Sequence, residues 1–244
     1  MVSSISRLLC VVVDASCPPP ALSNVCATDE PRRRSSARRG LLSCLVTVAL
    51  FAQAQLATAQ TEDSGRSVNR PAAVGGFLAG VVVGLGAHES GHVLFDVIFD
   101  ADPGVKRVEF HGIPFFAITH TSVPPRQEFA ISSAGFWVQH ATNEWLLTKR
   151  PRLREQSSAF TKGVFTFNVG VSAMYSIAAF ARTGPDERDT LGMAVSARVD
   201  EPWIGALVLG PAVLDTWRYF HPEARWPVWL SRAMKIGGVL LILR

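Results

Sequence analysis

The strongest constraint on the fold is a long uncharged stretch that runs directly into a cluster of ionisable residues. Residues 72–87 carry no charge, the next five are His88-Glu89-Ser90-Gly91-His92, and the apolar run Val93-Leu94-Phe95 follows. An ionisable side chain inside a membrane-length apolar segment costs about 2.5 kcal/mol or more unless it has a partner. The fold must therefore bring the polar side chains of this pentad together with one another, with another polar group or with an ion.

The spacing of the pentad predicts a metal site on a helix. Side chains four apart on a helix lie on one face, roughly 5–6 Å apart, so His88 and His92 can direct imidazole nitrogens at one divalent ion. We expect zinc (Zn²⁺), which accepts imidazole and carboxylate ligands and leaves one position open for water in catalytic sites. Glu89, rotated by about 100° from His88, would border that water and accept its proton as a general base. The pattern is typical of a metal-dependent hydrolase.

The composition favours a membrane protein with several spanning segments. The chain has 244 residues, of which 48% are hydrophobic and 18% charged, and its net charge is +4. Arginines within residues 1–40 supply most of the positive excess, so the rest is close to neutral and a nucleic-acid partner is not expected. All the cysteines precede residue 45. A metal site farther along must therefore use histidine and carboxylate ligands.

We expect three regions along the chain. Residues 1–59 have the order of a targeting or signal region, with arginines up to Arg39, an apolar run from Leu41 to Ala52 and small residues up to Ala59. Cleavage near Ala59 and an uncleaved anchor both fit this order. Residues 60–72 are mostly polar and predict a short linker. Residues 73–244 form the membrane-embedded domain.

This domain is predicted to be an all-α polytopic membrane bundle of about four to five helices, with a small β-hairpin after the first core helix. The first helix spans about 71–99, and the β-branched and aromatic residues of 105–121 favour the hairpin. Apolar segments near bilayer-spanning length occupy about 129–147, 160–181, 203–219 and 226–243. Tryptophans near the ends of these segments are typical of membrane interfaces.

One stripe of the first helix begins with small residues and ends with ionisable ones. Residues recur along it every four positions: Gly76, Gly80, Gly84, His88, His92 and Asp96. In lipid, glycines at this spacing let a neighbouring helix approach closely, which can bring a third ligand to the two histidines. Asp96, one turn beyond His92, is expected to orient the His92 imidazole as a hydrogen-bond partner.

The HExGH pentad late in the first core helix, the strand-like hairpin and a later helix that opens with Ser133-Ala134-Gly135 resemble the site-2 protease family of intramembrane zinc metalloproteases. The resemblance covers about residues 73–220, and the pentad is its only specific motif. It implies that His88 and His92 bind zinc, that Glu89 is the catalytic base and that a downstream aspartate is the third ligand. The chain departs from the family in lacking its Asn-Pro-x-x-Asp-Gly or Leu-Asp-Gly signature.

Two aspartates are candidates for the third ligand. Asp189 follows the helix that contains Asn168, as the family's aspartate follows an asparagine-containing segment, and we prefer it for this reason. An ordinary helix cap would explain its Asp-Thr context as well. Asp215 lies in an apolar segment, where a carboxylate is a functional candidate by default. An ion pair with Arg218 would also explain Asp215.

We therefore predict an integral protein of a bacterial inner membrane that uses zinc, held by His88, His92 and Asp189, to hydrolyse a peptide bond of a membrane protein or peptide. The alternative is a membrane sensor or transporter that uses the same ligands without proteolysis, and a hydrolase of lipids or other amides would share the carbonyl chemistry. The orientation stays open. The basic segment 149–154 should be cytoplasmic, whereas a cleaved signal would place it outside.

Overall fold

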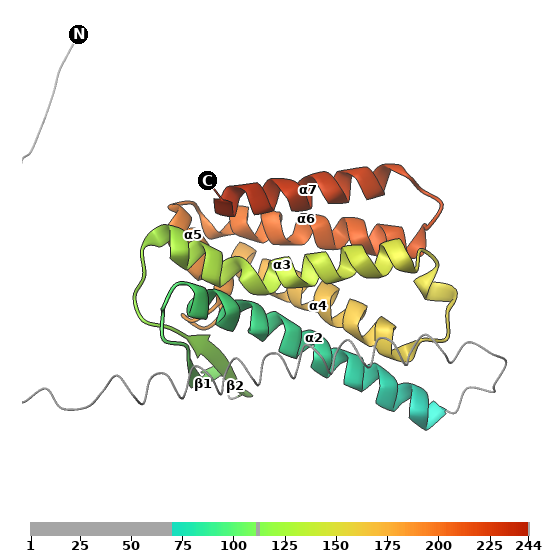
Figure 1. Cartoon of the computed structure of the whole chain (residues 1–244), viewed down its shortest axis with the longest axis horizontal. Coiled ribbons are helices and arrows are strands. Elements are labelled where there is room, and N and C mark those ends of the chain that lie inside the picture. Colours follow the sequence, from blue (N-terminus) through green and yellow to red (C-terminus); the bar gives the residue numbers. More distant parts are fainter. Residues whose placement is uncertain (1–69, 111–112, 244) are drawn as a thin grey trace, which may run out of the picture.

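The computed structural model describes residues 70–110 and 113–243, which form six α-helices and one β-hairpin (Figure 1). In chain order these are α2 (Arg70–Ile98), β1 (Gly104–Phe110), β2 (Ile113–Thr119), α3 (Pro125–Lys149), α4 (Ala159–Ala181), α5 (Asp189–Ala197), α6 (Glu201–Phe220) and α7 (Trp226–Leu243), with a 3₁₀ turn at Leu153–Glu155. The predicted targeting region of residues 1–59 and most of the linker of residues 60–72 lie outside the described residues.

The predicted combination of a helical bundle and a hairpin after the first core helix is confirmed. About four to five helices were expected, and the described residues contain six. The additional one is α5, which has 9 residues. A helix this short contains too few turns to produce a clear apolar period. Its only sign in the sequence is the Asp-Thr context of Asp189, which is typical of a helix cap.

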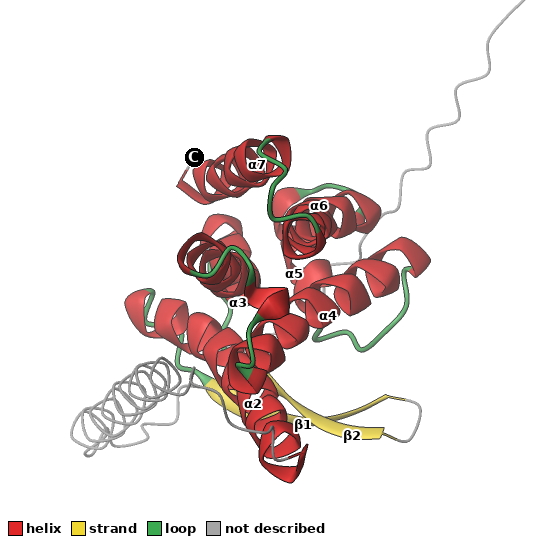
Figure 2. Cartoon of the chain, turned by 90° about the vertical axis from the view of Figure 1, so that its right-hand side faces the viewer, coloured by secondary structure: helices red, strands yellow, loops and turns green. Residues whose placement is uncertain are grey.

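The long helices lie lengthwise beside one another, and the short elements gather at one end. α2 packs against α3 and α4, and α6 packs against α4 and α7. α5 and the hairpin lie at the same end of the bundle (Figure 1), and Figure 2 shows α3, α6 and α7 nearly end-on. We call this end of the bundle the hairpin end, formed by residues 99–110, 113–128 and 182–201. The opposite, distal end consists of the start of α2 and of residues 149–162 and 221–225.

Glycines let α2 and α4 approach more closely than side chains would allow. A Cβ atom built on Gly80 would lie 2.1 Å from the carbonyl oxygen of Phe160, and one built on Gly163 would lie 2.1 Å from that of Phe77. Because both distances are far inside van der Waals contact, backbone meets backbone at this crossing. The small-residue stripe of α2 is therefore a packing surface at Gly80.

A tight connection returns the chain from α2 into the hairpin. Asp100 and Asp102 have positive φ angles of 57° and 47°, a conformation that aspartate tolerates better than most residues. β1 and β2 pair antiparallel, with Gly104 opposite Thr119. The backbone N–H of Thr121 then donates to the carbonyl oxygen of Ala101 at 2.8 Å. This bond ties the end of the hairpin back to the end of α2.

The interior contains polar pairs as well as apolar clusters. One apolar cluster lies between α3, α5 and α6 and comprises Phe136, Met193, Ala194, Ile204 and Val208. Between α3 and α4, the Asn168 side-chain amide of α4 donates to Asn143 Oδ1 of α3 at 2.9 Å. A buried amide without a partner would be costly, so this bond favours one alignment of α3 against α4.

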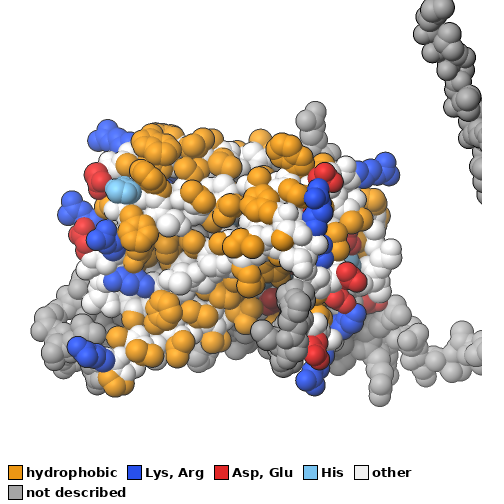
Figure 3. Space-filling model, turned by 180° about the vertical axis from the view of Figure 1, so that it is seen from behind, with side chains coloured by type: hydrophobic (Ala, Val, Ile, Leu, Met, Phe, Trp, Pro, Cys, Tyr) orange, Lys and Arg blue, Asp and Glu red, His pale blue; other side chains and the backbone are white. Residues whose placement is uncertain are grey.

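The outer surface of the bundle is strongly apolar between its two ends. Figure 3 shows hydrophobic side chains across the middle of one face, with charged side chains concentrated at both ends. Among the described helices, two, α2 and α4, are long and apolar enough to cross a membrane, and only 17% and 33% of their apolar windows are buried within the molecule. Most of this apolar surface therefore faces outward.

Candidate metal centre

His88, His92 and Asp189 meet at the hairpin end of the bundle. His88 and His92 lie on successive turns of α2, and Asp189 is the first residue of α5, 101 positions after His88. His88 Nε2 lies 3.2 Å from His92 Nε2 and 3.2 Å from Asp189 Oδ2, and His92 Nε2 lies 3.4 Å from the same oxygen. The structure thus brings together the three residues that the sequence predicts as ligands.

These separations fit a single tetrahedral ion. With ligand bonds of about 2.0–2.2 Å, neighbouring ligand atoms of a tetrahedral site are roughly 3.4 Å apart. The Nε2 atoms of His88 and His92 face each other at 3.2 Å. If both atoms carried a lone pair, the two lone pairs would repel each other unless a proton or a cation lay between them. The His-His-Asp group can therefore hold a metal ion.

The backbone of α3 fixes the orientation of His92. Its Nδ1 atom lies 2.8 Å from the carbonyl oxygen of Ile131, and both groups are buried. A carbonyl oxygen only accepts hydrogen bonds, so Nδ1 donates and the lone pair of the neutral ring lies on Nε2. Nε2 is the atom that faces His88 and Asp189. His92 is thus held in the tautomer that a metal ligand requires.

The prediction that Asp96 orients His92 is wrong. Asp96 is fully buried, but neither of its carboxylate oxygens has a hydrogen-bond partner within the described part of the chain. The physical reason is the close approach of α3 at Gly91, where an added Cβ would lie 2.9 Å from the carbonyl oxygen of Ala134. This approach brings a carbonyl group of α3 within reach of the His92 ring.

His88 is held by packing. A Cβ on Gly135 would lie 2.4 Å from Cε1 and 2.5 Å from Nδ1 of the His88 ring, so α3 needs a glycine here. The rings of Phe136 and Tyr175 flank the imidazole, with centroids at 5.5 and 6.3 Å. The Ala-Gly pair noted in the sequence therefore makes room for an imidazole.

Asp189 is positioned through its two neighbours in the chain. Arg188 forms a two-pronged ion pair with Glu201 of α6, with N···O distances of 2.7 and 2.8 Å, and the Thr190 hydroxyl donates to the same carboxylate at 2.8 Å. Burial alone would raise the pKa of Asp189, but the contacts with His92 and His88 outweigh it and hold that pKa well below its usual range. Asp189 is therefore in the ionised form that binds cations.

Asp215 is engaged elsewhere. Its Oδ1 atom lies 3.3 Å from Arg218 Nη1, 2.8 Å from Lys235 Nζ and 2.8 Å from Ser231 Oγ. The ion pair with Arg218, which was the alternative explanation for this residue, is thus confirmed. Among the described residues, the possible ligand group contains Asp189 and not Asp215.

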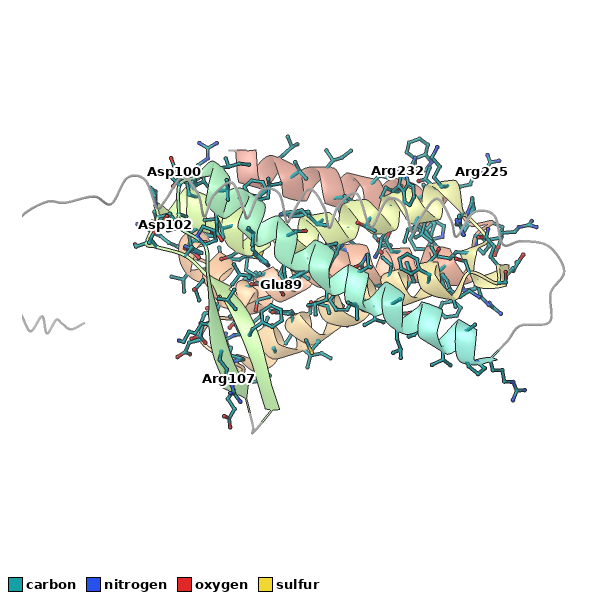
Figure 4. All side chains as sticks on the ribbon, turned by 60° about the horizontal axis from the view of Figure 1, so that its bottom comes forward. Glu89, Asp100, Asp102, Arg107, Arg225 and Arg232 are labelled. Carbon is teal, nitrogen blue, oxygen red and sulfur yellow. The ribbon has the colours of Figure 1, made fainter. Side chains whose placement is uncertain are left out.

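Glu89 lies beside the three ligand side chains without joining them. It is partly buried and interacts electrostatically with His88, His92 and Asp189, yet it has no ion-pair partner within residues 70–110 and 113–243. Figure 4 shows it partway along α2, between the bundle ends marked by Asp100 and Arg225. A carboxylate in this position is available to accept a proton from water near the ligands.

A cavity of about 210 Å³ opens beside the ligands, and β2 forms one of its walls. It is lined by His92, Ile118, Thr119, His120, Glu128, Ile131, Ser132, Asp186, Glu187, Arg188, Asp189 and Gly192. On its rim, His120 Nε2 lies 3.5 Å from Glu128 Oε2. This contact raises the pKa of His120 to about 9. The cavity joins the ligand group to an edge of the hairpin.

Tyr175 is a site residue that sequence reasoning missed. It lies on α4 with its ring beside His88 and Phe136, and its hydroxyl interacts with the Asp189 carboxylate. The available signal was chemical, because a tyrosine within an apolar helix usually finds a hydrogen-bond partner for its hydroxyl group. α4 thus contributes a polar group to the candidate centre.

In comparisons with known proteins, no family model, no curated protein and no solved structure matches this chain.

Proposed function

We propose that this protein is an intramembrane zinc metalloprotease, in agreement with the resemblance of its HExGH pentad to the site-2 protease family. The observation that carries the proposal is the set of ligand-atom separations of 3.2, 3.2 and 3.4 Å between His88, His92 and Asp189. The three atoms belong to the two pentad histidines and to a carboxylate of a separate helix. Glu89, the base expected from the pentad, lies next to them.

Membrane embedding is supported by how little of the apolar helices is buried. A core helix of a water-soluble protein would be mostly covered, whereas 17% of the apolar window of α2 and 33% of that of α4 are buried. Leaving such a surface in water would be unfavourable. A lipid bilayer is the environment that covers it, and we assign the chain to a bacterial inner membrane.

Zinc suits the donor set of two imidazoles and one carboxylate. When bound, it would supply Lewis-acid chemistry, polarising a peptide carbonyl and lowering the pKa of water. His88, His92 and Asp189 would hold the ion. Glu89 accepts a proton from the attacking water and returns it to the leaving amine.

The cavity wall formed by β2 suggests how a substrate is held. Ile118 and Thr119 line the cavity together with His92 and Asp189. β2 pairs with β1 on one side, so its other edge has backbone groups available to a substrate segment. An extended peptide can add to such an edge as another strand. This arrangement would place the scissile bond beside the ligands.

The substitution Glu89→Gln separates proteolysis from metal binding alone. It keeps the size and the hydrogen-bonding capacity of the side chain but removes the base, so cleavage of single-span model substrates in proteoliposomes should fall by about 10²-fold or more. Zinc content should stay unchanged, because Glu89 is not a ligand. A sensor or transporter would keep most of its activity, and cleavage at the wild-type rate by the variant would contradict the proposal.

A further inference from the structure

A cluster of charged side chains joins α3, α6 and α7 toward the distal end of the bundle. It consists of Glu144, Asp215, Arg218, Arg232 and Lys235. Glu144 of α3 contacts all three cations, and its oxygens lie 2.8 Å from Arg232 Nε and 3.0 Å from Lys235 Nζ. Lys235 Nζ and Arg218 Nη1 in turn lie 2.8 and 3.3 Å from Asp215 Oδ1. None of these residues belongs to the candidate metal centre.

The charges of this cluster do not balance. Three cations share two carboxylates, which leaves an excess of one positive charge. Two of the cations are held away from water, since the side chains of Arg218 and Lys235 are 5% and 10% exposed. A buried charge is costly unless an opposite charge compensates it. An additional anion would therefore stabilise the cluster.

A pocket of about 250 Å³ opens beside the cluster, where the end of α3 meets the loop between α6 and α7. Its polar lining residues are Thr148, Arg218 and Arg232, and its other lining residues are apolar. Among the described residues, no carboxylate lines it. Figure 4 shows Arg232 far from Asp100, toward the distal end. Two of the three cations of the cluster thus form part of one accessible wall.

Both arginines of the pocket have donors that the cluster does not use. Arg218 bonds to the two carboxylates through its Nη atoms. Arg232 donates from Nε to Glu144 and from Nη2 to Thr148 Oγ1. Within the described residues, Arg218 Nε and Arg232 Nη1 have no hydrogen-bond acceptor. Guanidinium donors of this kind suit the oxygens of phosphate and carboxylate groups.

The size and the surroundings of the pocket define the class of ligand. Pockets for drug-sized ligands measure about 300–1,000 Å³, so this one suits a small ligand or one end of a larger one. In the chain, Pro151 of its wall lies between Arg150 and Arg152, which add to the positive potential. Glu223 of the adjoining loop is not on the wall and lies 3.8 Å from His221 Nδ1. The pocket therefore favours a small anionic group with an apolar part.

We propose that this pocket binds a phosphate group, with Arg218 and Arg232 on its oxygens and the carbon-bearing part of the ligand against Leu147 and Val228. A phosphate monoester is preferred to a carboxylate because it offers three oxygens and up to two negative charges to the two guanidinium groups. The phosphate can belong to a water-soluble monoester or to the headgroup of a lipid. The site lies apart from the metal centre and does not depend on proteolysis.

Thermal unfolding of the full chain in a non-ionic detergent tests this site in two arms. The first compares sodium glycerol 3-phosphate with sodium chloride at equal ionic strength. The second compares phosphatidic acid with a diacylglycerol of the same acyl chains, which lacks the phosphate. A higher Tm with glycerol 3-phosphate supports a water-soluble ligand, and a higher Tm with phosphatidic acid alone supports a lipid. An unchanged Tm in both arms would overturn the proposal.

Two variants with the same change in charge separate the pocket from general electrostatic attraction. Arg232→Gln balances the charges of the cluster and should weaken binding of the stabilising phosphate compound by about tenfold or more, the effect of losing a charged hydrogen bond. Arg232→Lys, which keeps the charge, should bind more tightly than Arg232→Gln. Lys162→Gln is the matched control, because Lys162 lies at the distal end but donates to the Arg154 carbonyl oxygen and does not line the pocket.

Isothermal titration calorimetry of the purified variants measures these affinities. Lys162→Gln should bind the phosphate compound as tightly as the wild type does. Wild-type affinity in Arg232→Gln, or equal weakening in Arg232→Gln and Lys162→Gln, would show that the pocket does not recognise the phosphate. Since the Arg232 side chain is 39% exposed, its replacement leaves the apolar core intact, and the two arms with the wild type test the site without any variant.

Discussion

At the scale of single residues, the two histidines of the candidate centre are held in different ways. His92 is oriented by a buried hydrogen bond to the Ile131 carbonyl oxygen. His88 lies against Gly135 and the ring of Phe136, and its Nδ1 atom has no hydrogen-bond partner within the described residues. The orientation of His92 therefore depends on a backbone hydrogen bond from α3, and that of His88 depends on how closely its ring packs against α3.

Tyr175 should stabilise the centre through Asp189. The substitution Tyr175→Phe removes the hydroxyl that interacts with the Asp189 carboxylate and should weaken zinc binding by about 10–100-fold, the usual effect of losing a partner of a metal ligand. Chelator competition on the purified protein measures this. Tyr219→Phe is the matched control, since Tyr219 stacks on Phe165 and lies at the distal end. Equal zinc affinity in the two variants would show that Tyr175 has no part in the centre.

The residues of the centre were predictable to different degrees. His88, Glu89 and His92 form a local motif whose spacing specifies one helix face. Asp189 was preferred over Asp215 through the family resemblance alone. Neither aspartate shows in its local sequence how close it lies to the pentad of α2, because that distance depends on how the helices pack. The Ile131 carbonyl could not be predicted at all, since every residue has such a group and only the packing of α3 selects this one.

At the scale of secondary structure elements, the contact between α2 and α4 depends on glycine. A methyl group at position 80 would meet the backbone of Phe160 at 2.1 Å, so Gly80→Ala should force the helices apart and cost about 1–3 kcal/mol. Gly86→Ala is the control on the same helix. Its added methyl group meets nothing within 4 Å, so it should stabilise the helix by about 0.5–1 kcal/mol. Unfolding followed by circular dichroism distinguishes these opposite signs.

The contact between His120 and Glu128 joins the end of β2 to the first turn of α3 and should depend on pH. Because the ion pair raises the pKa of His120 from 6.5 to about 9, with a smaller contribution from Asp96, its stabilisation is complete below the lower value and disappears as the pH rises through about 9. Glu128→Gln should therefore lower the Tm at neutral pH and have little effect near about pH 10. A pH-independent difference in Tm would rule out this ion pair.

Most elements were predictable because each has a strong local signal. The helix predicted over about 71–99 is α2 (Arg70–Ile98), and the strand-like residues of 105–121 form β1 and β2. Pro71 suits a first helical turn, and Asp102-Pro103-Gly104 breaks the helix beyond it. α5 has no such signal. Its place is set by contacts with α3 and α6, which lie outside its own sequence.

At the scale of the whole molecule, the fold gives the two ends of the bundle different chemistry. The candidate ligand group, its cavity and the hairpin share one end, and basic residues for which the described part of the chain supplies no carboxylate partner share the other. The sequence shows each of these segments separately. It does not show which loops lie at the same end, because that depends on how the helices pack.

The proposed activity depends most directly on one zinc ion shared by α2 and α5, and metal analysis of the detergent-purified protein tests for this ion. We expect about one zinc per wild-type chain, as a three-ligand site of this type binds, and loss of that zinc in Asp189→Ala. Asp215→Asn, which changes the aspartate paired with Arg218 and Lys235, should retain it. Wild-type protein without stoichiometric zinc, or full zinc content in Asp189→Ala, would contradict the proposed centre.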